Sequence, residues 1–165
     1  MRVFAVAGYS STGKTTLVEA LIRELTRRGY SVSTVKSTTE DVKDMKGSDT
    51  ERHRMAGAKT TMLVGPESIM IQLKRPSSLK EVLSSIHGDL LLIEGMKERP
   101  IPKIWCIGKN ELPKALPDGV LAIYTWDEAP IGSEGQMISR YTIEQIGELA
   151  DLIETASIDL TEIDL

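Results

Sequence analysis

The chain has 165 residues, of which 41% are hydrophobic and 27% are charged, and its formal net charge is −4. This composition is typical of a soluble globular protein, and the length predicts one domain over residues 1–165. The acidic balance argues against nucleic acid or a membrane surface as the main partner, because both attract basic surfaces. Apolar runs fall well short of the roughly 20 residues of a membrane helix. A single cysteine, Cys106, excludes an intramolecular disulfide and favours the reducing cytoplasm.

The chain opens with the pattern of a strand, a helix and a second strand. Val3 to Ala7 is an almost continuous apolar run, which is typical of a strand buried on both faces of a parallel sheet. Thr16 to Arg28 has apolar residues at helical spacing, and Gly29 ends the pattern. Tyr30 to Lys36 alternates apolar and small polar residues, as a strand does. This order predicts a parallel α/β fold.

The rest of the chain alternates between apolar runs and polar segments. Ser37 to Ser48 lacks apolar periodicity and is predicted to be an exposed loop, whereas Asp49 to Ala58 and Ser78 to Ile86 are predicted helices, the second capped by Ser77 or Ser78. The predicted strands are Thr60–Val64, Ile69–Leu73, Leu90–Ile93, Ile104–Ile107 and Val120–Tyr124. Tyr141 to Glu154 is predicted to be an amphipathic helix, and the acidic tail after Ser157 to be frayed or docked late.

The segment between the first strand and the first helix matches the pattern of a phosphate-binding loop, G-x-x-x-x-G-K-[ST]. Glycines allow the backbone to wrap closely around an anion, backbone N–H groups point inward, and the start of the helix adds a positive dipole. Lys14 is expected to reach the β- and γ-phosphates as the catalytic cation, and Thr15 to bind Mg²⁺. The expected nucleotide-binding residues are Gly8, Tyr9, Ser10, Ser11, Thr12, Gly13, Lys14, Thr15 and Thr16. The fold prediction is therefore a three-layer sandwich like that of P-loop NTPases, with a mostly parallel central sheet.

A carboxylate at the carboxyl end of a neighbouring parallel strand is needed to complete a magnesium site. Glu94 ends the apolar run from Leu90 and is predicted to have this role together with Thr15. Asp89 is the competing carboxylate, but it precedes the same run and so belongs to the opposite edge of the sheet. The structural alternative is that Glu94 caps a loop or forms an ion pair with Lys97.

Several charged residues form a possible second site. Lys36 ends the second strand at the edge where the nucleotide is expected, or it is a solvated strand end. Asp49, Arg52 and His53 share one broad face of a helix, and the structural alternative is an exposed helix with an ion pair between Asp49 and Arg52.

Three segments occur in the order and spacing of a known family. They are the glycine loop, S-D-T-E-R-H-R-M-A-G-A from Ser48 to Ala58, and D-L-L-L-I-E-G-M-K from Asp89 to Lys97, followed by Ile101-Pro102-Lys103-Ile104. The chain thereby resembles the adapter proteins of molybdopterin-guanine dinucleotide biosynthesis, the protein B family of that pathway. The resemblance extends from Met1 to about Ile107, and its most specific part is the R-H-R-x-A-G-A segment with E-G-x-K downstream.

The resemblance implies a GTP-binding protein with Mg²⁺, weak GTPase activity and a homodimeric state. It implies that the chain assists the guanylyltransferase that joins GMP to molybdopterin, and it makes Asp49, Arg52 and His53 candidate site residues. Lys36 and Lys97 complete the possible second site. The sequence departs from the family at Ser37-Thr38-Thr39, where a histidine is usual, and at Gly108-Lys109, where an arginine is usual. These departures concern partner or pterin contacts. The apolar strand pair between Thr60 and Leu73 is a plausible dimer contact, since an exposed sheet edge favours pairing.

The alternative functions are a small-molecule kinase and a signalling GTPase. A small-molecule kinase needs a lid that carries arginines, for which Arg52 and Arg54 are the candidates. A signalling GTPase uses an Asn-Lys-x-Asp motif to read guanine, and the nearest segment, Gly108-Lys109-Asn110-Glu111, does not match it. Guanine specificity therefore depends on the resemblance alone.

Overall fold

The structure is a computed structural model that describes residues 1–42, 46–73, 79–126 and 138–163. The contacts between described residues divide the chain into two compact units. The first contains residues 1–37 and 84–165, and the second contains residues 38–83. The single domain over residues 1–165 that the sequence predicts stays a prediction.

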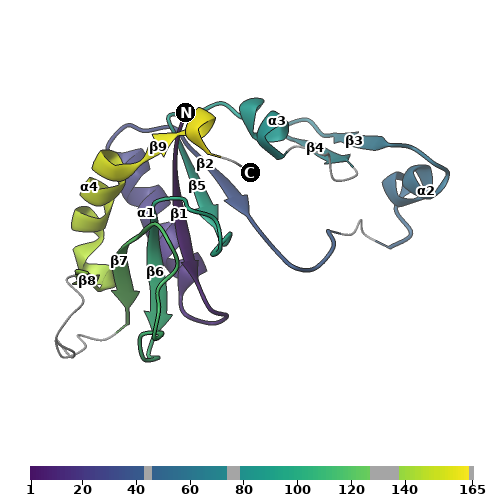
Figure 1. Ribbon diagram of the computed structural model, residues 1–165. Coiled ribbons are helices and arrows are strands. Elements are labelled where there is room, and N and C mark those ends of the chain that lie inside the picture. Colours follow the sequence, from purple (N-terminus) through teal and green to yellow (C-terminus); the bar gives the residue numbers. More distant parts are fainter. Residues whose placement is uncertain (43–45, 74–78, 127–137, 164–165) are drawn as a thin grey trace. The chain divides into compact units, whose positions relative to one another are not determined.

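The first unit is built on a seven-stranded sheet with β1 (Arg2–Gly8) near its centre (Figure 1). The strand order is β2-β5-β1-β6-β7-β8, and the short β9 pairs with β1 in the antiparallel sense. The other pairings are parallel. The strands that join β1 in this sheet are β2 (Val32–Lys36), β5 (Leu90–Glu94), β6 (Lys103–Gly108), β7 (Val120–Thr125), β8 (Arg140–Tyr141) and β9 (Ile158–Asp159). The mostly parallel α/β arrangement that the sequence predicts is confirmed.

Two helices, α1 (Lys14–Arg27) and α4 (Ile146–Ala156), pack together on one face of this sheet. Their apolar residues form the main core with alternate side chains of β1, β5, β6 and β7. Phe4 and Val6 point into this core, whereas Ala7 joins Trp105 in a smaller cluster on the other side of the sheet. The sheet is apolar on both faces, as the continuous hydrophobic runs of β1 and β5 predict.

The second unit contains α2 (Asp49–Met55), the hairpin β3 (Thr60–Val64) and β4 (Ile69–Leu73), and most of α3 (Leu79–Ser84). Ser48 caps α2 by accepting a hydrogen bond from the amide N–H of Glu51. β3 and β4 are antiparallel and end where the sequence predicts them to end. The serines predicted to cap α3, Ser77 and Ser78, lie outside the described residues.

The sequence prediction was wrong near the carboxyl end. Tyr141 is not helical: it belongs to β8, where it pairs with Tyr124 of β7. Thr142 and Gln145 then form a capping box around a short 3₁₀ turn, η1 (Ile143–Gln145), and the α-helix begins at Ile146. Sheet pairing with β7 thus prevailed over the local helical pattern. For the tail, where the sequence leaves fraying or docking open, the structure shows docking as far as Ile163: β9 and the 3₁₀ turn η2 (Leu160–Glu162) follow α4, and Leu160 is buried.

Candidate nucleotide-binding site

The glycine loop connects the carboxyl end of β1 to the first turn of α1. Gly8 has a φ of 143°, and a Cβ atom there would lie 2.3 Å from the carbonyl oxygen of Cys106 on β6. Gly13 has a φ of 86° and precedes the first residue of α1. Both positions therefore require glycine, because a side chain would strain or block the turn. Burial raises the pKa of the neighbouring Cys106 thiol to about 12, which makes it a poor nucleophile at neutral pH.

Side chains within the loop stabilise its shape. Thr12 is buried, and its hydroxyl donates to the carbonyl oxygen of Tyr9 at 2.9 Å. The ammonium group of Lys14 donates to the same carbonyl oxygen at 2.5 Å, so its side chain folds back over the loop. Ser11 has a φ of 59°, a left-handed value that few non-glycine residues adopt. Residues with such strained backbone angles are concentrated at ligand-binding sites. Among the described residues, no side chain caps the start of α1, so its first N–H groups can bind an anion.

Glu94 ends β5 beside this loop, as the sequence predicts. It pairs in register with Val6 of β1, and its carboxylate is largely buried. The hydroxyl of Thr15 donates to its Oε1 atom at 3.0 Å, and the Nζ atom of Lys36 lies 3.2 Å from the same oxygen. The competing carboxylate, Asp89, lies at the other end of β5, where it accepts hydrogen bonds from Ser31 that lower its pKa.

These contacts fit a magnesium ion held by few protein ligands. Mg²⁺ typically binds one or two protein oxygens and completes its octahedron with water and substrate phosphates. Thr15 and Glu94 offer a hydroxyl and a carboxylate at the edge of the glycine loop. Within the described ranges, no group of three or more His, Cys, Asp or Glu side chains is arranged to hold a metal.

Lys97 follows Glu94 in the connection between β5 and β6 and lies beside the loop. Its ammonium group is 5.4 Å from the centroid of the Tyr9 ring, a distance at which a cation and a ring attract each other. This ammonium group lies 3.8 Å from the carboxylate of Glu98. The ion pair of Glu94 is formed with Lys36, in place of the alternative pair with Lys97. The Tyr9 ring in turn contacts Trp105 edge to face at 5.6 Å.

Asp49, Arg52 and His53 lie on α2 in the second unit, and their part in a site with the loop stays a prediction. Arg52 Nη1 is 3.5 Å from Asp49 Oδ1, which is the ion pair of the structural alternative. Both side chains are more than three-quarters exposed. A pair of this kind contributes little to stability.

Sequence reasoning assigned no site role to two residues of the first unit, Lys103 and Trp126. Lys103 is fully buried in β6, and its ammonium group donates to the backbone carbonyls of Lys97, Arg99 and Asp118. Burial lowers its pKa. It thereby supports the connection that carries Lys97. Trp126 follows β7 and lies against Gly13. The sequence did offer a signal for each of these residues: Lys103 is a lysine inside an apolar run, and Trp126 is an aromatic residue at the carboxyl end of a strand.

Among the described residues, no helix has the length and apolar character needed to cross a bilayer.

The family described as molybdopterin guanine dinucleotide synthesis protein B, MobB, matches residues 3–126. The molybdopterin-guanine dinucleotide biosynthesis adapter protein of Haemophilus influenzae is 35% identical over 161 residues, which is 92% of this chain and 87% of that protein.

Crystal structures of MobB proteins have the same fold. The MobB homologue of Bacillus stearothermophilus superposes with a TM-score of 0.68 at 26% identity and covers 93% of this chain and 98% of its own. Bacillus subtilis MobB superposes with a TM-score of 0.76 at 22% identity and covers 96% and 99%. The predicted fold class is thereby confirmed.

Proposed function

The chain belongs to the MobB family of molybdopterin guanine dinucleotide synthesis proteins, and from that premise we propose that it is a GTP-binding adapter of molybdenum cofactor biosynthesis. In this role it assists the guanylyltransferase that joins GMP to molybdopterin, and it acts in the cytoplasm. The family resemblance supports the assignment to this pathway. The geometry of the site supports nucleotide binding, and the single observation that supports nucleotide binding best is the contact between Thr15 and Glu94 at the end of the glycine loop.

The arrangement supports slow hydrolysis of the γ-phosphate. The loop amides and the start of α1 would bind the β- and γ-phosphates, and Lys14 would move from the Tyr9 carbonyl to the phosphate oxygens. Bound Mg²⁺ would supply charge neutralisation, held by Thr15 and Glu94. The ammonium group of Lys36 lies 3.2 Å from the same Glu94 oxygen that accepts from Thr15, and it holds the carboxylate beside the loop. Lys97 adds a second cation beside Tyr9.

We expect no fast turnover from this chain alone. Glu94 is held by Thr15 and Lys36, so it is occupied as a ligand rather than placed as a general base. An arginine supplied by a partner or by a second copy of the chain would increase the rate. This fits an adapter better than an enzyme with its own small substrate.

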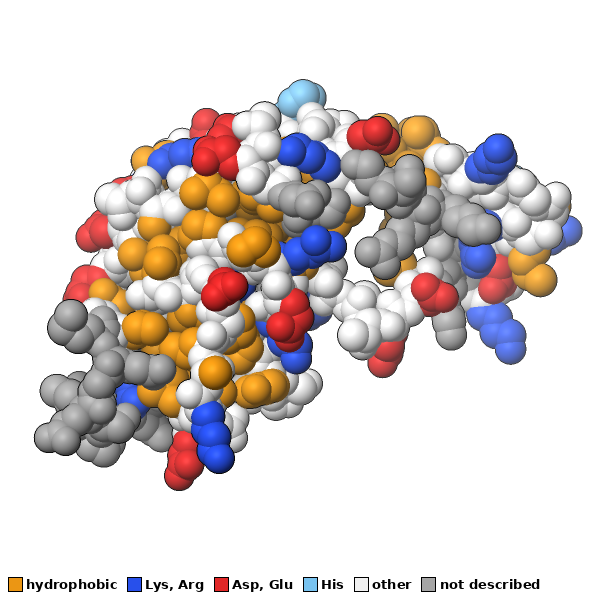
Figure 2. All heavy atoms as spheres, viewed as in Figure 1, with side chains coloured by type: hydrophobic (Ala, Val, Ile, Leu, Met, Phe, Trp, Pro, Cys, Tyr) orange, Lys and Arg blue, Asp and Glu red, His pale blue; other side chains and the backbone are white. Residues whose placement is uncertain are grey.

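The hairpin of the second unit supports a homodimer. Its apolar side chains are exposed on both faces, which a lone two-stranded sheet cannot bury by itself. The exposed members are Met62, Leu63, Val64, Ile69, Met70, Ile71 and Leu73. Figure 2 shows hydrophobic side chains at the surface of this unit. We propose that a second copy of the chain covers them.

Calorimetric titration tests the nucleotide assignment. GTP, ATP and GDP, each with Mg²⁺, are titrated into the purified protein, and we expect tighter binding of GTP than of ATP. A preference for ATP would favour the kinase alternative and contradict the proposal. Addition of the chain to the purified guanylyltransferase with GTP and molybdopterin then tests the adapter role, since the yield of the dinucleotide cofactor should rise.

A further inference from the structure

The strand order indicates on which side of the glycine loop the nucleoside of a bound nucleotide lies. β5 and β2 lie on one side of β1, and they end in Glu94 and Lys36. β6 and β7 lie on the other side. If the γ-phosphate and its metal lie at Glu94, as the proposed function requires, the phosphate chain runs across the loop away from β5. The nucleoside therefore emerges over the carboxyl ends of β6 and β7.

Trp126 lies at this position, directly after the last residue of β7. Its amide N–H donates to the carbonyl oxygen of Gly108, the last residue of β6, at 3.3 Å, and the hydroxyl of Thr125 donates to the same oxygen at 2.9 Å. The indole lies against the glycine loop: a Cβ atom at Gly13 would be 2.4 Å from its Nε1 atom. A Cβ atom at Gly108 would be 3.5 Å from its Cε2 atom. The ring is thus held between the last glycine of the loop and the end of β6.

The two tryptophans of the chain differ in how the fold uses them. Trp105 is 1% exposed and belongs to the apolar cluster on one face of the sheet. Trp126 is 45% exposed, although a hydrogen bond from its amide N–H anchors its backbone and its ring lies against the loop. A single exposed aromatic residue is unremarkable on a protein surface. Here the position matters, because this partly exposed ring lies against the loop that, in the proposed function, binds the phosphates.

We propose that Trp126 is the platform on which the nucleobase of the bound nucleotide packs. Aromatic side chains and nucleobases stack favourably because both present π-faces and both lose apolar surface to water. Stacking accepts any purine, so Trp126 contributes affinity for GTP and ATP alike and leaves the choice between them to polar groups. The inference rests on the proposed nucleotide function, and it adds the base subsite to it.

Trp126 could stack on the nucleobase or could only support the shape of the glycine loop. Calorimetry with a ligand that lacks a base distinguishes these two roles. GTP, ATP and inorganic tripolyphosphate, each with Mg²⁺, are titrated into the wild-type chain, Trp126→Leu and Trp126→Phe. We expect Trp126→Leu to lose about tenfold in affinity for both nucleotides, whereas Trp126→Phe, which keeps an aromatic face, loses much less. The affinity for tripolyphosphate should be the same in all three proteins.

Fluorescence gives a second measurement that does not depend on affinity. GTP should quench the wild-type emission, and the quenching should disappear in Trp126→Phe, which retains Trp105. Tripolyphosphate should leave the wild-type emission unchanged. Equal losses of GTP and tripolyphosphate affinity in Trp126→Leu would overturn the inference, because Trp126 would then only shape the loop. Unchanged GTP affinity in Trp126→Leu would also overturn it.

The wild-type titrations distinguish failure of the base subsite from failure of the nucleotide proposal. If GTP binds no more tightly than tripolyphosphate, the base makes no contact and the inference is wrong, while phosphate binding stands. If neither ligand binds, the nucleotide function itself fails and the inference fails with it.

Discussion

Thr15 and Glu94 are 79 positions apart in the sequence, and the Thr15 hydroxyl nevertheless donates a hydrogen bond of 3.0 Å to the Glu94 carboxylate. The parallel pairing of β1 with β5 causes this contact. Glu94 is in register with Val6, so β5 ends beside the point where β1 enters the glycine loop. The loop then returns Thr15 to the same edge in the first turn of α1. A hydroxyl and a carboxylate thus meet at the edge of the glycine loop, where the proposed function requires a magnesium ion and a γ-phosphate.

Glu94→Gln keeps the shape of this side chain and removes its charge. We expect the increase in GTP affinity and hydrolysis that Mg²⁺ causes to fall by roughly tenfold, because the metal loses an anionic partner. Binding of GTP without Mg²⁺ should change little. Asp89→Asn, at the opposite end of β5, is the matched control and should keep the full magnesium effect. Equal losses with and without Mg²⁺ would argue against a metal role for Glu94.

Lys14→Ala should reduce the affinity for GTP by about 100-fold while the circular dichroism spectrum stays native. The expected loss follows from removal of a charged hydrogen bond to phosphate. In the structure this ammonium group bonds a loop carbonyl and supports no core contact, so the fold should tolerate its removal. Arg23→Ala, an exposed cation on the same helix, controls for general electrostatic attraction. Retained affinity in Lys14→Ala would refute the phosphate-loop assignment.

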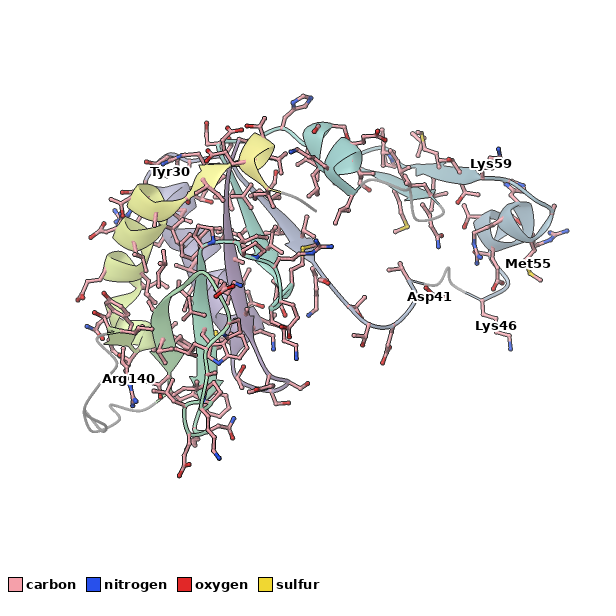
Figure 3. The ribbon with its side chains drawn as sticks, viewed as in Figure 1. Tyr30, Asp41, Lys46, Met55, Lys59 and Arg140 are labelled. Atoms are coloured by element: carbon pink, nitrogen blue, oxygen red, sulfur yellow. The ribbon has the colours of Figure 1, made fainter. Side chains whose placement is uncertain are left out.

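Leu63→Glu places a charge in the exposed hairpin, opposite Met70 of β4. If a second copy covers the hairpin, the variant should be monomeric by light scattering at concentrations where the wild-type chain is dimeric. Met55→Glu is the matched control, since Met55 is an exposed apolar residue on α2, outside the hairpin (Figure 3). A dimer that both variants retain would place the interface elsewhere.

Lys103→Met should destabilise the protein by about 3 kcal/mol, because three backbone carbonyls lose their buried donor. Methionine has a similar length, so little volume is lost. Urea unfolding measures the change, and Lys46→Met, at an exposed lysine, should leave the free energy of unfolding unaltered. A near-neutral effect of Lys103→Met would mean that the connection between β5 and β6 does not depend on this lysine.

Glu24 links acid stability to the contact between α1 and α4. Hydrogen bonds from Arg27 and then Arg28 lower its pKa from 4.5 to about 2, and Arg28 also binds Asp151 on α4. A lowered pKa means that the folded state binds this proton more weakly than the unfolded state. The carboxylate therefore stabilises the fold above about pH 4.5, and this contribution is lost as the pH falls toward 2.

Glu24→Gln should thus lower the free energy of unfolding at pH 7, and its difference from the wild-type protein should shrink between pH 4.5 and 2. Denaturant unfolding across this range measures it. Glu19→Gln, an exposed carboxylate on the same helix, is the control. A difference for Glu24→Gln that does not vary with pH would contradict the linkage.

The sequence by itself determined the features that depend on local pattern. The glycine loop, the buried strand before it and the helix after it follow from spacing and composition, and Glu94 follows from the rule that ligands bind at the carboxyl ends of parallel strands. Asp89 was assigned to the other edge by the same reasoning, and the structure places it there.

Only the tertiary structure decided which distant side chains meet. Lys36 replaces Lys97 as the partner of Glu94 because β2 pairs with β5. Tyr141 becomes a strand residue because β7 offers it backbone partners, although its own segment has a helical pattern. Lys103 contacts backbone carbonyls and Trp126 lies against Gly13 because the fold brings these distant segments together. Such contacts depend on strand order and register, which no local window of the sequence contains.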